Sequence, residues 1–214
     1  MPIEHLSPAY RIRTGRLVIR CWNPTDAPLL STAIAPSLEH LKVWLPWARE
    51  EPKDLQQRVG WLRQSRGEFD LGQNFNYGIF NLDETQVLGA IGLHTDSYDD
   101  ALEIGYWIGA HHINHGLATE AAAALTKVAF EVNQVMRVEI HCAPTNLASA
   151  AVPRKLGFTH EATLRQREED HEGCKRDSMV WSLFNFVEVE FFYQCKKMLC
   201  CRRKIRIAQQ TNTY

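Results

Sequence analysis

The sequence predicts an α+β fold, an α/β/α sandwich in which helices pack on a mixed, mostly antiparallel sheet. Two observations predict it. Between residues 76 and 108, short apolar segments follow one another with only brief polar turns between them, which favours antiparallel neighbours. The full order of segments is strand, helices, three strands, helix, strand, helix and two strands, which is typical of helices around a mixed sheet. With 214 residues and 45% hydrophobic composition, the chain can form one packed domain.

The first third of the chain predicts one strand followed by helices. Residues 17–22 read as a strand, and the Asn-Pro dipeptide after it is a breaker. Asp26 is expected to cap a following helix. Residues 36–70 look largely helical and amphipathic, with interruptions at Pro46 and Pro52.

Three further strands are predicted in the middle of the chain. Residues 76–80 and 87–93 are strand candidates, and the polar segment 81–86 between them is a hairpin loop. A second turn at 97–100 leads into a strand at 102–108. These connections are too short for crossover helices, so the three strands should be antiparallel.

The second half alternates helices and strands. The segment 117–131 is rich in alanine, which favours helix. The remaining elements are a strand at 135–142, a short helix from about Asn146 to Lys155 that ends at Gly157, a strand from Phe158 and a last strand at 178–184.

Composition narrows the function classes. The net charge of −1 gives no reason to expect DNA or RNA as a partner. The sequence has no run of about 18 apolar residues, so no membrane span is expected, and its start lacks an apolar signal core. Six irregularly spaced cysteines are more typical of reduced thiols than of a disulfide framework, which predicts a cytoplasmic protein.

The charge balance changes near the C-terminus. Six basic and two acidic residues give residues 185–214 a charge of +4, which leaves −5 for residues 1–184. We therefore expect a catalytic domain at 10–184 and a basic, cysteine-containing extension at 185–214. Binding to an anionic membrane, acylation and contact with ribosomal RNA are open alternatives for the extension. A helical or irregular extension without such a role is favoured.

The stretch 111–120, HHINHGLATE, lies between a predicted strand and a predicted helix. The first turn of a helix presents N–H groups without helical acceptors and a positive dipole end, which together favour a bound anion. Gly116 permits close approach to the backbone, small Ala118 leaves room, and Thr119 adds a hydroxyl donor. The stretch predicts a diphosphate site made mainly by backbone, although an ordinary loop is the alternative.

The three histidines of this stretch also raise the possibility of a metal site. Such residues ligate zinc when they share a helical face. Here they precede the helix, and no carboxylate or thiolate lies beside them. Solvent-facing loop histidines are the better interpretation, and no metal is predicted.

Four motifs in a fixed order carry a family resemblance. They are EIGYWIG at 103–109, GLATEA at 116–121, NLAS at 146–149 and KLGF at 155–158, joined by TGRLVIR at 14–20 and VWLPW at 43–47. Together they resemble the GNAT superfamily of N-acetyltransferases, in particular the ribosomal-protein serine/alanine N-terminal acetyltransferases. The resemblance covers roughly residues 10–184. It implies the acyl-CoA N-acyltransferase fold and direct transfer from acetyl-CoA to an amine, without an acetyl-enzyme.

The resemblance also implies roles for individual residues. The backbone of Trp107, Ile108 and Gly109 is expected to bind the pantetheine arm and the thioester carbonyl. Asn146 is expected to contact CoA, and Ser149 to lie near the sulfur as a proton donor or hydrogen-bond partner of the thiolate. The expected diphosphate loop consists of Asn114, His115, Gly116, Leu117, Ala118 and Thr119.

The sequence departs from the family pattern at three positions. Ile113 stands where relatives carry Gln or Arg, and Asn114 replaces a common glycine, although Asn tolerates left-handed backbone. Pro153 stands where many relatives carry a tyrosine that acts as the general acid, which favours Ser149 as the proton donor. Pro153 also removes a helical hydrogen bond to the carbonyl of Ser149.

Strand alternation selects a candidate base. In segment 102–108 it places Glu103, Gly105 and Trp107 on one face, so Glu103 can orient or deprotonate the amine. A solvent-facing strand charge is an equal alternative. His141 is another candidate, but a structural strand histidine is favoured. Trp44 and Trp47 either line the acceptor groove or pack in the core. For Asn146, an N-cap is a strong alternative.

Three functions remain open on the sequence alone. The first is an N-acetyltransferase for the N-terminal amine of a protein such as a ribosomal protein. The second is an acetyltransferase for a small primary amine, such as a polyamine, an amino acid or an antibiotic. The third is a CoA-binding module without catalysis. A monomer or homodimer is expected.

Overall fold

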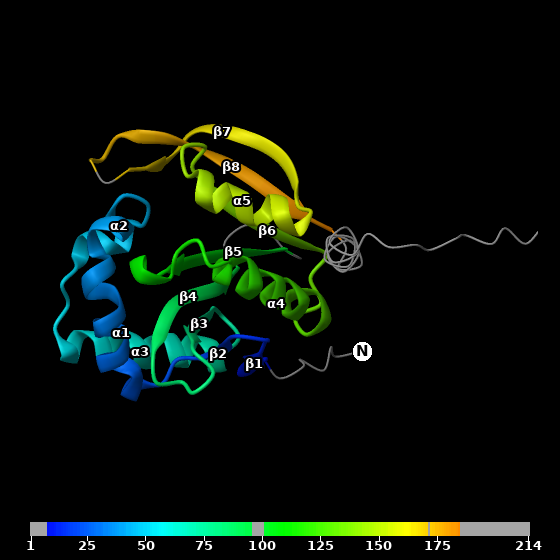
Figure 1. The fold of residues 1–214 in the computed structure, drawn as a ribbon. Helices are drawn as coiled ribbons and strands as arrows, with labels where there is room; N and C mark the ends of the chain where they lie inside the picture. The colour runs from blue at the N-terminus through cyan, green and yellow to red at the C-terminus, as the bar shows by residue number, and fades with distance from the viewer. Residues whose placement is uncertain (1–7, 96–100, 171, 185–214) are drawn as a thin grey trace, which may run out of the picture.

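The computed structural model describes residues 8–95, 101–170 and 172–184, and eight strands in this part of the chain form one mixed sheet (Figure 1). They are β1 (Arg11–Arg13), β2 (Val18–Cys21), β3 (Phe75–Phe80), β4 (Val87–His94), β5 (Ala101–Ile108), β6 (Arg137–Cys142), β7 (Thr159–Glu169) and β8 (Lys175–Leu183). Their order is β1-β2-β3-β4-β5-β6-β8-β7, with β5 and β6 parallel and the other neighbours antiparallel. The predicted fold class is therefore confirmed.

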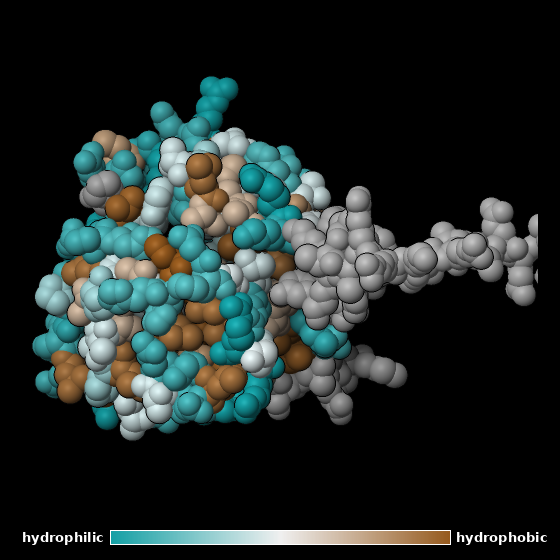
Figure 2. Space-filling model, viewed as in Figure 1, coloured by the Kyte–Doolittle hydropathy of each residue, from teal (hydrophilic) through white to brown (hydrophobic). Residues whose placement is uncertain are grey.

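Helices cover both faces of the sheet. They are α1 (Ala27–Ile34), α2 (Leu38–Lys42), α3 (Leu55–Asp70), α4 (Leu117–Glu131) and α5 (Leu147–Leu156), with short 3-10 helices η1 (Pro24–Asp26), η2 (Ala35–Ser37), η3 (Pro46–Glu50) and η4 (Ala110–His112). One core cluster joins α4 and α5 to the sheet, and a second joins α1 and α3 to Trp22, Phe80 and Val87. Figure 2 shows that apolar residues on the visible face form small patches separated by hydrophilic ones.

Within the described residues the predicted helices and strands are present, with two differences. The short edge strand β1 was not predicted, because three residues carry too little pattern. The helical region 36–70 divides into α2, η3 and α3, and Asp54 starts α3 by accepting the N–H of Gln57 at 2.7 Å. The predicted turn at 97–100 and the extension at 185–214 lie outside the described residues.

The prediction that Asp26 caps the following helix is wrong. Asp26 occupies the position before α1, but its side chain makes no cap hydrogen bond there. Its carboxylate instead accepts two hydrogen bonds from Arg20, at 2.7 and 2.8 Å, and one from the backbone N–H of Asn23 at 2.8 Å. The Asp26 side chain is almost completely buried in this ion pair. A hydrogen bond from the charged guanidinium is stronger than one from a neutral backbone N–H, so the carboxylate pairs with Arg20 and does not cap the helix.

The parallel pair β5–β6 separates along its length. Within these strands the ladder joins Ala101 to Arg137, Leu102 to Val138 and Glu103 to Glu139, and extends no further. On its other edge, β5 stays paired with β4 as far as Ile108, opposite Gly89. The C-terminal half of β5 therefore leaves β6, and groups from β5 and α5 meet across the resulting opening.

Candidate active site

The connection between β5 and α4 turns through two left-handed residues. Asn114 has φ 62° and Gly116 has φ 77°, and Gly116 is the residue before the first turn of α4. Glycine adopts this region freely and asparagine tolerates it better than most residues, so the predicted turn survives the loss of a glycine at 114. The turn brings the chain to the start of α4, whose first N–H groups have no helical acceptors.

The segment after β1 braces this loop. Arg16 donates to the carbonyl oxygen of His115 at 2.9 Å, and its Nε and Nη2 each lie 2.7 Å from Oε2 of Glu120. Thr14 donates to the other carboxylate oxygen of Glu120 at 2.6 Å. Burial favours a higher pKa for Glu120, but the hydrogen bonds from Thr14 and Arg16 outweigh it and lower the pKa. The acid in the first turn of α4 is thus neutralised by Arg16, which leaves the helix start suited to an anion.

The loop histidines do not form a metal centre in the described part of the chain. No group of three or more His, Cys, Asp or Glu residues there is arranged to hold a metal ion. His112 lies 3.2 Å from the amide nitrogen of Gln86, so its Nε2 accepts a hydrogen bond from that amide. Burial, reinforced by His111 and His115, lowers the pKa of His112. The structure therefore gives His112 a contact with the β3–β4 loop.

Tyr106 joins β5 to α5 across the opening. Its hydroxyl donates to the carbonyl oxygen of Ser149 at 3.1 Å and lies 3.0 Å from the Ser149 hydroxyl. Pro153 has no N–H with which to occupy the Ser149 carbonyl, so that carbonyl is available to the phenol. Burial raises the pKa of Tyr106, so the phenol stays protonated. Asn146 caps α5 by accepting the N–H of Ser149 at 3.1 Å, as its alternative interpretation proposed.

The backbone at the end of β5 lies very close to β4. Gly109 donates its N–H to the carbonyl of Leu88 at 2.9 Å, so this donor belongs to the strand pairing. Gly89 of β4 lies opposite Ile108 of β5. A Cβ built on Gly89 would lie 2.2 Å from the carbonyl oxygen of Trp107 and 3.1 Å from the Cα of Ile108. Only glycine permits this approach, which fixes the backbone that is expected to hold the thioester.

Glu103 lies at the base of the opening. Its carboxylate is 3.3 Å from Nδ1 of His141, whose Nε2 is 2.7 Å from Glu139, which in turn pairs with Arg137 at 2.8 Å. His141 thus lies between two carboxylates, those of Glu103 and Glu139. Glu103 occupies the predicted face of β5, but it is not among the residues that line the pocket described next.

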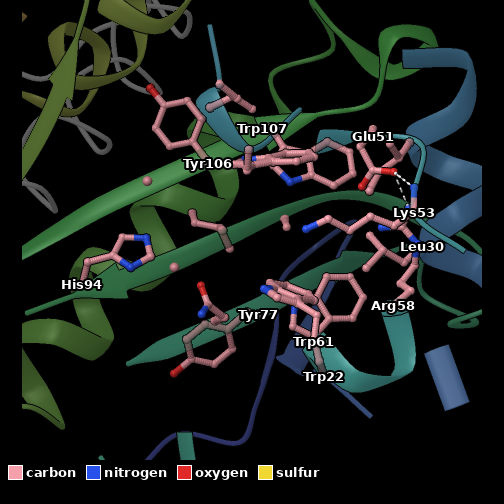
Figure 3. Close-up of a pocket in the computed structure, with 18 residues that line it drawn as sticks. Trp22, Leu30, Glu51, Lys53, Arg58, Trp61, Tyr77, His94, Tyr106 and Trp107 are labelled. Atoms are coloured by element: carbon pink, nitrogen blue, oxygen red, sulfur yellow. Dashed lines mark hydrogen bonds and ion pairs between the residues drawn. The ribbon is translucent and has the colours of Figure 1, made fainter. Parts of the chain in front are cut away.

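A pocket of about 340 Å³ lies between the sheet and the segments α1, η3 and α3 (Figure 3). Its walls are mainly apolar, and the aromatic residues that line it are Trp22, Trp47, Trp61, Tyr77, Tyr106 and Trp107. The rings of Trp47 and Trp107 are 6.0 Å apart, so Trp47 lines the pocket, whereas Trp44 lies outside its lining. Glu51, Lys53 and Arg58 lie at one end and His94 at the other. This pocket is the candidate acceptor site.

Three residues of the candidate site were not predicted from the sequence. They are Arg16 beside the loop before α4, and Tyr106 and His94 in the pocket. Arg16 lay inside a recognised motif but had no assigned partner. Tyr106 had a usable signal, because Pro153 left the carbonyl of Ser149 without its helical donor. His94 had only a weak one, the glycines at 92 and 105 that the strand register places beside it.

A sheet that opens between two parallel strands, with a helix that starts after a left-handed glycine and an adjoining pocket, is the arrangement of acyl-CoA N-acyltransferases. The family model of the acetyltransferase (GNAT) domain matches residues 16–159, and the chain belongs to this family. It is therefore an N-acetyltransferase, and enzymes of this family use acetyl-CoA as the acetyl donor.

Individual relatives agree with this assignment. "Putative ribosomal N-acetyltransferase YdaF" of Bacillus subtilis (strain 168) is 31% identical over 150 residues, which is 70% of this chain and 81% of that protein. The ribosomal-protein-serine acetyltransferase of Escherichia coli (strain K12) is 26% identical over 129 residues, 59% of this chain and 72% of that protein. A crystal structure described as a probable acetyltransferase superposes with a TM-score of 0.74 at 29% identity, covering 82% of this chain and 97% of that one.

The predicted diphosphate site at Gly116 can be tested with substitutions at a matched pair of glycines. Gly116→Val forces a β-branched residue into left-handed backbone beside Arg16, whose Nη2 would lie 3.7 Å from the new Cβ. We expect the KM for acetyl-CoA to rise about tenfold or more with little change in kcat, since about 1.4 kcal/mol of lost binding is tenfold. Gly173→Val imposes similar strain at φ 81° in the β7–β8 turn with no atom within 4 Å, and should leave this KM unchanged. Equal KM values for acetyl-CoA in the two variants contradict a diphosphate site at Gly116.

Proposed function

We propose that the protein acetylates the N-terminal amine of a protein, such as a ribosomal protein, by direct attack on acetyl-CoA. The observation that carries the proposal is the small aromatic pocket beside the Tyr106–Ser149 junction. Its volume is at the lower end of ligand pockets, which suits one amine-bearing terminal residue. The names of two relatives, which refer to ribosomal N-acetyltransferases, support this acceptor. A ribosomal acceptor implies a cytoplasmic reaction.

The charges of the pocket argue against a polyamine. Glu51 is the one carboxylate among the described lining residues, and it is paired with Arg58 at 2.7 Å. Lys53 lies at the same end and pairs with Glu50 at 2.9 Å, so the charges there balance in pairs. A polycation would find no carboxylate among the described lining residues that lacks a cationic partner, so spermidine should be a poor acceptor.

In the proposed mechanism the loop from Asn114 to Thr119 binds the diphosphate, with Arg16 holding the loop in place. The backbone near Trp107 and Ile108 holds the thioester carbonyl, since fixed N–H donors stabilise developing oxyanion charge. Asn146 contacts CoA, and Ser149, fixed by Tyr106, assists the departing thiolate. Glu103, next to the pocket on the same face of β5, orients the amine electrostatically.

The decisive experiment follows release of the CoA thiol from acetyl-CoA with peptides that begin with Ser, Ala or Met, and with spermidine alongside. We expect turnover on at least one peptide class and much weaker turnover on spermidine. Turnover on spermidine alone assigns the protein to the small-amine acetyltransferases. If no acceptor reacts, calorimetric titration with acetyl-CoA separates an untested acceptor from a protein that does not bind the donor.

A further inference from the structure

His94 is the last residue of β4 and stands at one end of the acceptor pocket (Figure 3). In the β4–β5 ladder it lies opposite Glu103, two residues from the pair formed by Gly92 and Gly105. Alternation along β4 and β5 turns His94 to the same face as Gly105 and Trp107, which line the pocket. A half-buried imidazole is therefore placed where an acceptor amine would enter.

Two glycines make room for the ring. A Cβ built on Gly92 would lie 2.9 Å from both Nε2 and Cε1 of His94, and one built on Gly105 would lie 3.1 Å from Nε2. Real Cβ atoms do not approach other atoms as closely as 2.9 Å, so a side chain at position 92 would displace the imidazole, and one at position 105 would crowd it. The absence of side chains on two neighbouring strands lets His94 lie flat over the sheet with Nε2 above Gly92 and Gly105.

The other ring nitrogen fixes the tautomer. Nδ1 of His94 is 2.8 Å from Oδ1 of Asn74, and the amide nitrogen of Asn74 donates to Glu68 at 3.5 Å. Because the amide oxygen can only accept, Nδ1 must carry the hydrogen. The lone pair of the neutral ring is then on Nε2, the nitrogen above the glycines. Asn74 is itself held at the end of α3, where its N–H reaches the carbonyl of Glu68 at 3.5 Å.

We infer that His94 is the catalytic proton acceptor for the incoming amine, an assignment that rests on the proposed N-acetyltransferase function. Nε2 takes one proton from the ammonium group of the acceptor. The amine lone pair then forms the C–N bond with the acetyl carbon as the C–S bond breaks. A second amine proton passes to the sulfur, with Ser149 assisting, and the imidazolium releases its own proton to solvent. The products are the acetamide, CoA thiol and one proton.

The surroundings of the ring decide how its charge is balanced. Among the described residues, Glu103 faces it from β5, and His141 and Glu139 of β6 lie behind Glu103. Glu68 of α3 lies behind Asn74. Two carboxylates near an imidazole favour its protonated form, so they stabilise the imidazolium that proton transfer creates. Glu103 thereby acts as a positioning residue for His94.

The test is the pH dependence of turnover on the best peptide acceptor. Wild-type protein should lose activity towards low pH as Nε2 becomes protonated, because a protonated ring cannot take the proton of the amine. This loss of activity forms the acid limb of the pH profile. His94→Gln should lower kcat by about 100-fold and remove the acid limb, while the KM for acetyl-CoA is retained. The amine of the acceptor contributes a separate limb near pH 8, which should persist in the variant. Ser149→Ala should lower kcat without moving the acid limb.

Two further variants separate catalysis from a structural effect. Asn74→Asp places a negative charge on Nδ1–H, which favours imidazolium, so the acid limb should move up by about one pH unit. His160→Gln removes a histidine of β7 that is not among the residues lining the pocket, and it should keep both the limb and kcat. An unchanged acid limb in His94→Gln or in Asn74→Asp overturns the assignment.

The tautomer gives a readout that is independent of turnover. In protein with nitrogen-15 histidine, the signals absent from His94→Gln identify His94, and their shifts should show hydrogen on Nδ1. Hydrogen on Nε2 at neutral pH overturns the inference even if the enzyme is active. If wild-type protein acetylates no primary amine, the proposed function fails instead, and the tautomer still tests the geometry of His94.

Discussion

Gly89→Ala should lower kcat/KM by about 100-fold although the substitution adds one methyl group and alters no catalytic side chain. The new Cβ would lie 2.2 Å from the carbonyl oxygen of Trp107 and 3.1 Å from the Cα of Ile108. Both are backbone atoms, so the clash is relieved only if β5 moves away from β4. That segment is proposed to hold the thioester carbonyl, and a displacement of about 1 Å in such a site costs about 100-fold in rate.

Gly89→Ala should also lower the stability of the fold, but by too little to unfold it. Overpacking typically costs about 1–3 kcal/mol, which lowers the melting temperature by a few degrees in a chain of this size. The control is Gly67→Ala on the exposed side of α3, where no atom lies within 4 Å of the new Cβ. That change should stabilise the helix slightly and leave kcat/KM unaltered. Wild-type kcat/KM in Gly89→Ala contradicts the role given to this part of β5.

The elements of the fold could be predicted because their signals are local. Segments 87–93 and 102–108 are apolar runs of strand length between polar turns, and α4 is marked by its alanines. The left-handed turn at Asn114 and Gly116 was also readable, since both residue types favour that backbone region. The three-residue strand β1 and the partner of Asp26 were not, because an edge strand and a buried ion pair depend on tertiary neighbours.

The candidate site was predicted only where its residues belong to contiguous motifs. Ser149 was selected from its motif, but its partner Tyr106 is 43 residues away. Arg16 reaches Glu120 across 104 residues. His94 acquires its place through the register that sets Gly92 opposite Gly105. Such contacts follow from strand pairing and helix packing, which sequence spacing does not contain.

The second large effect concerns the buried ion pair at the other end of the acceptor pocket. The side chains of Arg58 and Glu51 are 6% and 3% exposed, and Nη2 of Arg58 is 2.7 Å from Oε2 of Glu51. The same oxygen accepts the N–H of Lys53 at 2.8 Å, so the carboxylate anchors the turn between η3 and α3. Arg58→Met should destabilise the protein by about 3–5 kcal/mol, because it leaves a buried carboxylate without its counter-charge.

Removing both charges should cost much less than removing one. In the Glu51→Gln/Arg58→Met double variant, no uncompensated charge is buried, and the glutamine oxygen can still accept the N–H of Lys53. Urea unfolding of the wild type, both single variants and the double variant forms the thermodynamic cycle, with Arg66→Met as control, since its pair with Asp70 is 38% and 44% exposed and should cost under about 1 kcal/mol. A double variant as unstable as Arg58→Met would mean that packing, and not the charge pair, holds this wall.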